Sequence, residues 1–281
     1  MILSFHPCFE SDTNILCAGR LPDDSDRAAI QTADAVILPQ GCRIELFDMA
    51  TRHCRNVFPD YQARFQYPGK TGQIRLFEQT NVPHPKTTTF NDIHQYHQKT
   101  RSNPVNQIFS FPVVFKFNWG GEGETVFLIR NPADLERRIQ NAELFEKNHQ
   151  KGFLIQEYIP MDQKVLRVVV VGTYYQSYWR IQESPEKFST SLSTGARIDH
   201  ERDPDLQQKA IHAVQDFCQK TSINLAGFDL LFSTKENPEV PLFLEINYFF
   251  GRKGLGGSER FYELLNGQIK AWIDALPKSL K

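Results

Sequence analysis

The sequence predicts an α/β and α+β fold in which a small N-terminal α/β lobe precedes two α+β lobes. Short apolar strands alternate with a helical stretch near the N-terminus, whereas later strands are separated by longer amphipathic helices. The chain of 281 residues is also too long for one small hydrophobic core, and its length suits two or three packed lobes. We therefore expect lobes at residues 1–85, 86–159 and 160–281.

Composition argues against several classes of partner. Lys and Arg number 32 against 33 Asp and Glu, so the net charge of -1 creates no global field that would attract nucleic acid. The N-terminus lacks a basic start and no apolar run could span a bilayer, so we expect a cytoplasmic protein without a membrane partner. The five cysteines include no Cys-x-x-Cys pair, which is typical of reduced thiols.

The first lobe is predicted to be a small βαβ-like unit. Residues 2–5 form a short apolar strand, residues 27–33 a helical stretch, and residues 35–38 a second buried strand. His6 and Cys8 follow the first strand, at the edge where an open α/β sheet presents contacts to ligands. They are therefore candidates for substrate contact.

The central lobe is predicted to contain a hairpin with a flexible tip. A helix that carries Ile74 and Phe77 stops before Pro83, and the new lobe follows. Residues 111–117 form a strand that runs into a glycine cluster, and residues 126–129 form its hairpin partner. A flexible glycine loop between paired strands results.

The C-terminal lobe is predicted to be α+β. A strand at residues 153–159 leads into Pro160, where the lobe boundary falls. Beyond it we expect strands at residues 166–171, 227–232 and 242–246, a helix that begins at Asp203 and Pro204, and a last amphipathic helix over residues 261–273.

Polar side chains in two of these strands predict a metal site. Glu245 and Asn247 lie two positions apart in an otherwise apolar strand, so both project from the same face. Asp229 interrupts the preceding apolar strand, and three oxygen donors could then converge, as Mg²⁺ prefers. The alternative is that Asp229 and Glu245 form salt bridges to an arginine inside the sheet.

A phosphate site is predicted where Lys116 precedes Gly120, Gly121 and Gly123. Glycines let backbone N–H groups approach phosphate oxygens closely, and a lysine at the strand end adds a point charge. The alternative is an ordinary flexible hairpin with an exposed strand lysine.

The strand that ends before Pro160 is a candidate for adenine recognition. Its last residues are Gln156, Glu157, Tyr158 and Ile159, and their backbone could hydrogen-bond an adenine edge at a lobe junction. The alternative is an ordinary buried strand.

Taken in order, these features resemble the ATP-grasp superfamily, and within it the branch of glutathione synthetases and RimK-like ribosomal-protein glutamate ligases. The resemblance covers residues 70–254 and implies an ATP-grasp fold, in which two α+β lobes enclose the nucleotide. It makes Lys70 and Lys116 similar to two ATP-binding lysines, and Gly120 and Gly123 similar to glycines of the small phosphate loop. By the same resemblance residues 156–159 correspond to the adenine hinge, and Asp229, Glu245 and Asn247 to the metal triad.

The resemblance also implies an activity. The expected enzyme is an ADP-forming ligase that activates a small-molecule or peptide carboxylate as an acyl phosphate, which an amine, a thiol or a similar nucleophile then attacks. It would use ATP with one or two Mg²⁺ ions, for which Mn²⁺ can substitute. Lys70 and Lys116 would neutralise the phosphates, while Arg180 and Arg167 would stabilise the transferring group. A homo-oligomer is compatible with this expectation.

Three departures from the family pattern concern the ribose contact and the substrate end. Val165 stands where family members commonly carry an acid for the ribose, which leaves Asp162, Gln163 or Lys164 for that contact. The segment at residues 188–196 lacks the arginine and asparagine of the family loop. Tyr248-Phe249-Phe250-Gly251 replaces Ser-Pro-Gly and is followed by the basic pair Arg252 and Lys253.

These departures keep two rival functions open. One is an ATP-grasp phosphotransferase that phosphorylates a non-carboxylate acceptor without ligation. The other is a nucleotide-binding module that senses ATP and has lost turnover.

Overall fold

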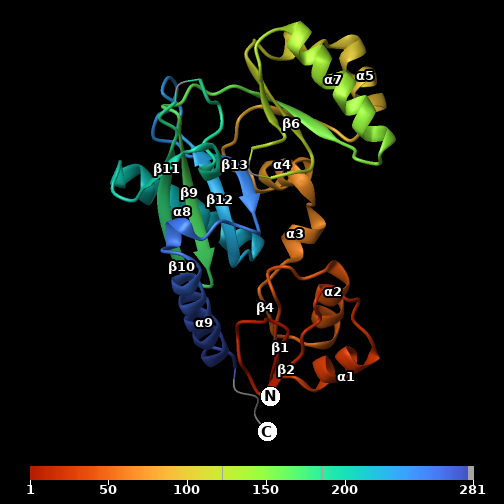
Figure 1. Cartoon of the computed structure of the whole chain (residues 1–281), viewed down its shortest axis with the longest axis vertical. Helices are drawn as coiled ribbons and strands as arrows, with labels where there is room; N and C mark the ends of the chain where they lie inside the picture. The colour runs from red at the N-terminus through yellow and green to blue at the C-terminus, as the bar shows by residue number, and fades with distance from the viewer. Residues whose placement is uncertain (122, 185, 278–281) are drawn as a thin grey trace.

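A computed structural model describes residues 1–121, 123–184 and 186–277, and three β-sheets organise the chain. One sheet is parallel and two are antiparallel, which confirms the predicted fold class. In Figure 1 the parallel sheet lies at the bottom, the central sheet at the upper right and the C-terminal sheet at the left. No helix in the described ranges is long and apolar enough to cross a membrane.

The N-terminal sheet has four short parallel strands. Their spatial order is β2 (Thr13–Asn14), β1 (Ile2–Ser4), β3 (Ala35–Ile37) and β4 (Val57–Phe58), with α1 (Asp24–Thr32) and α2 (Ile44–His53) between them in the chain. A capping box at Asp23 starts α1 three residues earlier than expected. The sequence analysis missed α2 and both edge strands, since a two-residue strand shows no alternation.

Helix α4 (Gly69–Thr80) follows the short helix α3 (Gln62–Gln66) and lies between the other two sheets. Its side chains Ile74, Leu76 and Phe77 belong to the core that the N-terminal and C-terminal lobes share. The helix ends at Asn81, whose left-handed backbone stops it before Pro83, as expected. The first turn of α4 therefore lies close to both antiparallel sheets.

The central sheet is an antiparallel layer that two helices cover. Its order is β5 (Thr87–Phe90), β8 (Phe153–Glu157), β6 (Val113–Phe117) and β7 (Val126–Ile129). Helices α5 (Ile93–Ser102) and α7 (Pro132–Lys147) lie side by side against it, and the short α6 (Val105–Ile108) lies between α5 and β6 in the chain. The expected hairpin is present, and Asn131 caps α7 by accepting from the Asp134 backbone N–H.

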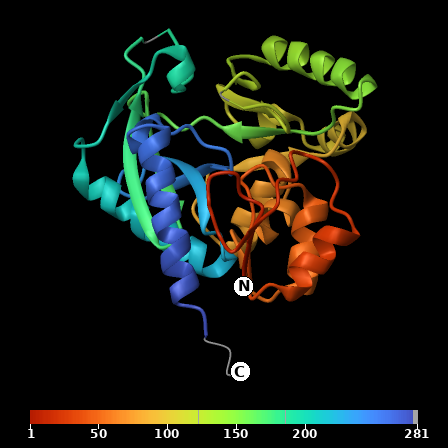
Figure 2. The ribbon, with the colours of Figure 1, turned by 60° about the horizontal axis from the view of Figure 1, so that its bottom comes forward.

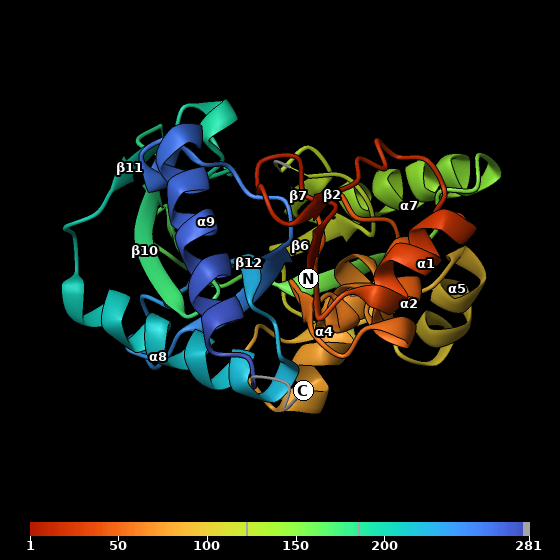
Figure 3. The ribbon, with the colours of Figure 1, turned by 90° about the horizontal axis from the view of Figure 1, so that it is seen from below.

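The C-terminal sheet is antiparallel and has five strands. Their order is β11 (Arg197–Asp199), β10 (Tyr174–Ile181), β9 (Lys164–Val171), β12 (Leu225–Leu231) and β13 (Leu242–Asn247). Helix α8 (Pro204–Thr221) packs on the face that carries Val168, and α9 (Ser258–Asp274) packs on the face that carries Val169. Figure 3 shows both helices beside this sheet.

Helix α9 also joins the C-terminal lobe to the N-terminal sheet. Trp272 of α9 stacks near Phe58 of β4, with ring centroids 5.5 Å apart. In Figure 2 the helix runs down beside the first strands of the chain. The parallel sheet is thereby held against the C-terminal lobe rather than attached by a linker alone.

A matched pair of glycines tests the packing of α4. A Cβ on Gly72 would lie 2.4 Å from the carbonyl carbon of Tyr67, whereas a Cβ on Gly267 of α9 would meet nothing within 4 Å. Gly72→Ala should therefore lower the free energy of unfolding by about 1–3 kcal/mol. Gly267→Ala should raise it by about 0.5–1 kcal/mol, because alanine is the better helix former. Urea denaturation measures both, and equal effects of the two changes would contradict this account of α4.

Candidate functional site

A cavity of about 580 Å³ lies between the central and C-terminal sheets, with α4 at one end. It brings together almost all the residues that the sequence analysis proposed for nucleotide, metal and catalysis. The cavity wall includes Lys70, Lys116, Gly121, Gly123, Gln156, Glu157, Tyr158, Ile159, Arg167, Arg180, Asp229, Glu245 and Asn247. Gly120 is absent from the wall and lies just behind it, where its carbonyl accepts a hydrogen bond from Lys70.

Lys70 lies in the first turn of α4, which Asn118 ties to the central sheet. The Asn118 side-chain oxygen accepts from the Thr71 backbone N–H at 2.9 Å and from the Thr71 hydroxyl at 3.0 Å. Gly69 allows this approach, since a Cβ there would lie 2.5 Å from the same oxygen. Lys70 Nζ then donates to the Gly120 carbonyl at 2.9 Å and lies 3.7 Å from Glu245. The lysine thus connects the glycine loop with the C-terminal sheet.

Lys116 is buried, so the alternative of an exposed strand lysine does not hold. Only 8% of the residue is accessible, and no hydrogen bond or ion pair reaches its Nζ from the described residues. Burial lowers the pKa of Lys116 to about 8, against an opposing effect of Glu245. Within the described ranges, the side chain is therefore a buried amine without an anionic partner at contact distance.

The glycine loop connects β6 to β7 above these lysines. Gly120 has a φ of +79°, and a Cβ there would lie 2.4 Å from Thr125 Cγ2, so only glycine fits. A Cβ on Gly123 would lie 2.7 Å from the Ser189 hydroxyl, which places the loop against the segment at residues 188–194. Two segments distant in sequence therefore meet at this end of the cavity.

The predicted adenine hinge is the end of a central strand. Gln156 lies between Thr87 and Val114 of the neighbouring strands, and its side chain donates to the Thr87 hydroxyl at 2.8 Å. Glu157 accepts from the Lys86 backbone N–H at 2.8 Å. The strand ends at Glu157, two residues earlier than expected, and the chain continues along the cavity wall. The side chains of Gln156 and Glu157 thus hold the strand in place. The backbone that follows them lies in the cavity wall.

Asp229 forms a buried ion triad with two arginines. Its carboxylate accepts from Arg167 Nε at 2.5 Å, from Arg167 Nη2 at 3.0 Å and from Arg180 Nη2 at 2.8 Å. Burial alone would raise the pKa of Asp229, but the two arginines outweigh it and lower the pKa. The alternative of an arginine salt bridge inside the sheet therefore holds for Asp229. Arg180 Nε is buried without a partner among the described residues, so one donor stays available.

Glu245 and Asn247 lie on the neighbouring edge strand, beside Asp229. Glu245 pairs directly with Asp229 in the strand register, and the Asn247 amide donates to Asp229 at 3.3 Å. Gln73 of α4 holds this strand, because its side chain bonds both the N–H and the C=O of Ile246 at 2.9 and 2.8 Å. The sequence analysis missed Gln73, since a glutamine on a helix carries no signal for a partner so far along the chain.

The donor chemistry of this group fits magnesium in part. Two carboxylates and one amide oxygen are the ligands that Mg²⁺ prefers. No cluster of three or more His, Cys, Asp or Glu side chains within the described ranges could hold a metal. The oxygens of Asp229 already accept four donors, which is about the capacity of a carboxylate. Asp229 can therefore join a metal site only when one of these donors, an arginine or the Asn247 amide, withdraws.

The altered family segments also line the cavity. Residues 188–193 form one wall, and buried Gln182 holds them by donating to the carbonyls of Ser189 at 3.1 Å and Thr194 at 3.3 Å. Val165 lines the cavity as well, at the position where the family carries an acid. Asp162, Gln163 and Lys164 are absent from the wall, and Asp162 instead approaches Lys164 at 3.7 Å.

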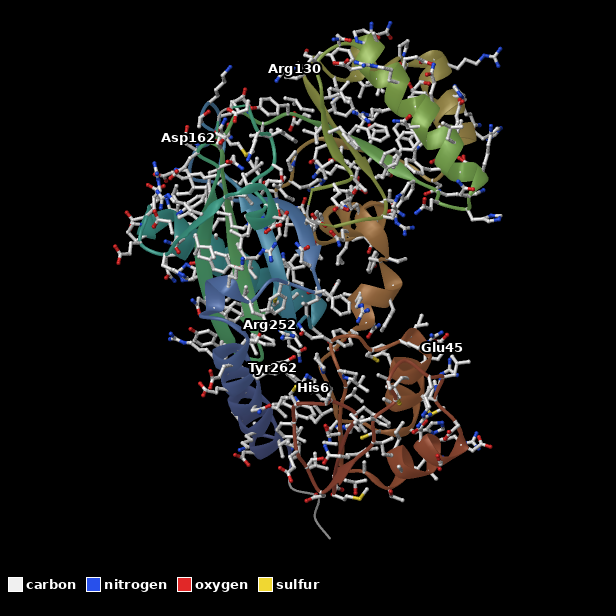
Figure 4. All side chains as sticks on the ribbon, viewed as in Figure 1. His6, Glu45, Arg130, Asp162, Arg252 and Tyr262 are labelled. Atoms are coloured by element: carbon white, nitrogen blue, oxygen red, sulfur yellow. The ribbon has the colours of Figure 1, made fainter. Side chains whose placement is uncertain are left out.

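The two early candidates lie beside the cavity rather than in its wall. His6 is buried, and burial together with the charge of Arg252 lowers its pKa to about 4. Its Nδ1 accepts from the Cys8 backbone N–H at 3.1 Å, and the Cys8 thiol is exposed. Figure 4 places His6 next to Tyr262 and Arg252, where the N-terminal sheet meets the C-terminal lobe.

Comparison with known proteins identifies a family for this chain and several structures with a similar fold. Residues 69–266 match the RimK-like ATP-grasp domain. The fold is similar to that of the RimK domain ATP-grasp protein of Sphaerobacter thermophilus DSM 20745, with a TM-score of 0.62 and 13% identity over 95% of this chain and 98% of that one. It is also similar to the VanG D-Ala:D-Ser ligase of Enterococcus faecalis, with a TM-score of 0.61 and 16% identity over 85% of this chain and 73% of the ligase.

A third similar structure is the ADP complex of an N5-carboxyaminoimidazole ribonucleotide synthetase, with a TM-score of 0.58 and 13% identity. The match covers 85% of this chain and 59% of that enzyme, so this chain spans less than two thirds of its length. No curated protein sequence shows a significant match. At these identities the solved structures show a common fold and do not show a common substrate.

The ion triad generates a stability prediction. Asp229→Asn should lower the free energy of unfolding by about 3–5 kcal/mol, because it leaves buried Arg167 and partly buried Arg180 without their counter-charge. Glu245→Gln should change it by less than about 1 kcal/mol, because Glu245 is partly exposed and contacts Lys70 only at 3.7 Å. Urea denaturation without nucleotide or metal measures both. Similar losses in the two variants would show that Asp229 is not the main counter-charge.

Proposed function

Because this chain belongs to the RimK-like ATP-grasp family, we propose that it is an ADP-forming ligase that activates a substrate carboxylate with ATP. The observation that carries the proposal is one cavity lined by two buried lysines, a glycine loop, two carboxylates with an amide, and two arginines. These are the groups that phosphoryl transfer needs, since that reaction depends on positioning and on neutralising charge.

The nucleotide occupies the cavity between the two antiparallel sheets. The backbone after Glu157 hydrogen-bonds the adenine edge, and the glycine loop covers the phosphates. Lys70 and Lys116 neutralise the phosphates, and the absence of a contact anion for Lys116 among the described residues supports this role. Asp229, Glu245 and Asn247 would hold Mg²⁺, which supplies further positive charge at the phosphates when it is bound.

The reaction proceeds in two displacements. A carboxylate oxygen of the substrate attacks the γ-phosphorus of ATP, the bond between that phosphorus and the bridging oxygen breaks, and ADP leaves. The nitrogen or sulfur of the second substrate then attacks the acyl carbon, phosphate leaves, and the proton of the nucleophile passes to solvent. Arg180 donates to the transferring phosphoryl group, for which its unpartnered Nε is available, and Arg167 keeps Asp229 in place.

The partners proposed for this reaction are a small-molecule or peptide carboxylate and a nucleophile. The VanG protein is a ligase by name, which supports ligation over simple phosphorylation. A cytoplasmic location and a homo-oligomeric state stay predictions.

Lys116 generates a test of nucleotide binding. Its pKa of about 8 leaves roughly half of the free amine neutral at pH 8, and bound phosphates favour the ammonium form. ATP binding at pH 8 should therefore take up about half a proton, and affinity should fall as the pH rises above 8. Lys116→Met should weaken ATP binding and remove the uptake.

Calorimetry of ATP binding in two buffers of different ionisation enthalpy measures this uptake. Arg75→Gln is a charge-matched control, because Arg75 lies on the same helix as Lys70 but outside the cavity wall. The same proton uptake in wild type and Lys116→Met would assign the proton to another group.

Trapping of the acyl phosphate tests the reaction itself. Incubation with ATP, magnesium, hydroxylamine and a panel of amino acids, dicarboxylates and tricarboxylates should give a hydroxamate with at least one acid, together with ADP and phosphate. Glu245→Gln and Arg180→Met should each suppress this product on the order of 100-fold while weakening ATP binding much less.

Two results would contradict the ligase. A native substrate that carries the phosphate on a hydroxyl group would identify a phosphotransferase. Nucleotide that binds in the cavity but is not consumed in the presence of that substrate would identify a sensing module. Arg75→Gln serves again as the control that should keep full hydroxamate formation.

A further inference from the structure

The cavity continues beyond the proposed phosphate site to the segment at residues 248–253. Phe249, Phe250, Arg252 and Lys253 of this segment all line it. The segment lies near the ion triad, because Arg167 Nη1 and Phe250 Cβ both flank Gly227, at 3.0 and 3.1 Å from the position of an added Cβ. The basic pair therefore belongs to the same cavity as the proposed reaction centre, at its substrate end.

The other cationic side chains of the cavity each have a carboxylate nearby or an assigned role at the phosphates. Arg167 and Arg180 share the carboxylate of Asp229, and Lys70 faces Glu245 at 3.7 Å. Lys116 is assigned to the phosphates. This leaves Arg252 and Lys253 as cations in the cavity wall without a carboxylate partner among the described residues.

Arg252 is held in place entirely by neutral groups. Its guanidinium lies 4.4 Å from the ring centroid of Tyr262 and 4.8 Å from that of Phe261. Its two hydrogen bonds are long, at 3.5 Å to the Gln40 side-chain oxygen and 3.5 Å to the Ser258 hydroxyl. Stacking fixes the orientation of the fork while its strong donors stay unmatched by an anion, which is the arrangement of a preformed oxyanion receptor.

The N-terminal sheet lies behind this end of the cavity wall and contacts its residues. Gln40 follows β3 and reaches both Arg252 and the carbonyl of Tyr248, the latter at 3.5 Å. His6 follows β1 and packs edge-on against Tyr262, with ring centroids 6.1 Å apart (Figure 4). Both residues lie at the carboxyl edge of an open parallel sheet, where such sheets contact ligands.

We propose that Arg252, with Lys253 beside it, binds a second oxyanion of the substrate, at a distance from the carboxylate that is activated. This proposal rests on the proposed ligase function and names the substrate class within it. The substrate carries at least two anionic groups, and the second is a carboxylate or a phosphate-type group. A singly charged acid would leave the guanidinium fork unmatched.

Calorimetry with three dicarboxylates and their half-amides tests this proposal. Succinate, glutarate and adipate are each compared with the half-amide of equal length, in the presence of magnesium and a non-hydrolysable ATP analogue. At least one doubly charged acid should bind about tenfold more tightly than its half-amide, which corresponds to about 1.4 kcal/mol. 3-Phosphonopropionate forms a further arm, and a preference for it would identify a phosphate-type second group.

Variants of Arg252 test whether the preference for doubly charged acids over half-amides depends on this residue. Arg252→Gln should reduce the preference to less than about twofold while leaving the affinity for the half-amides unchanged, and Arg252→Lys should keep part of it. Arg260→Gln is the matched control, because Arg260 is exposed, lies eight positions further along and does not line the cavity. It should leave the preference intact.

Melting temperatures with and without ATP and magnesium distinguish failure of the second-anion proposal from failure of the proposed ligase function. If ATP with magnesium raises the melting temperature of both wild type and Arg252→Gln, the fold and the nucleotide site are intact in both. If the doubly charged acids and the half-amides then bind equally, or if neither binds, the second-anion proposal alone is overturned. A preference that survives in Arg252→Gln would overturn it as well. Loss of the nucleotide effect in wild type would instead overturn the proposed function.

Discussion

The arrangement of charged side chains in the cavity depends on the need to compensate buried charge. Asp229, Arg167 and Arg180 lie together between two sheets, and an unpaired charge at that depth would cost several kcal/mol. The carboxylate therefore accepts from both arginines, and the same carboxylate is one of three groups suited to magnesium. A metal ion would compete with these donors for Asp229, so loading of the site requires that an arginine or the Asn247 amide moves. A released Arg180 would lie in the cavity where phosphoryl transfer is proposed.

Helix α4 supplies the geometry that this chemistry needs. Asn118 ties its first turn to the central sheet, and Gln73 ties its next turn to the edge strand of the C-terminal sheet. Lys70 lies between these two attachments and reaches the glycine loop on one side and Glu245 on the other. One helix thus sets the distance between the proposed phosphate and metal groups, although those groups come from different lobes.

The two segments that depart from the family pattern both line the cavity, one beside the glycine loop and the other beside the N-terminal sheet. Buried Gln182 holds residues 188–193 through the Ser189 carbonyl, and residues 248–253 present an arginine stacked on aromatic rings. Apart from Val165 at the ribose position, the groups suited to the nucleotide follow the family pattern, whereas the groups suited to the substrate do not. Membership of the family therefore says more about how the nucleotide is bound than about which acid is the substrate.

The sequence by itself determined the order of the lobes, most strands and helices, and the residue types that converge on the cavity. Hydrophobic periodicity and glycine or proline positions are local properties, so residues such as Glu245 and Asn247 could be placed on one face of one strand. Only the tertiary structure decided which charges meet. Arg167 and Asp229 are 62 positions apart, and Gln73 and Ile246 are 173 positions apart, so no local pattern records either contact. The burial of Lys116 and the neutral surroundings of Arg252 were likewise decided by packing, because both depend on side chains that distant segments bring together.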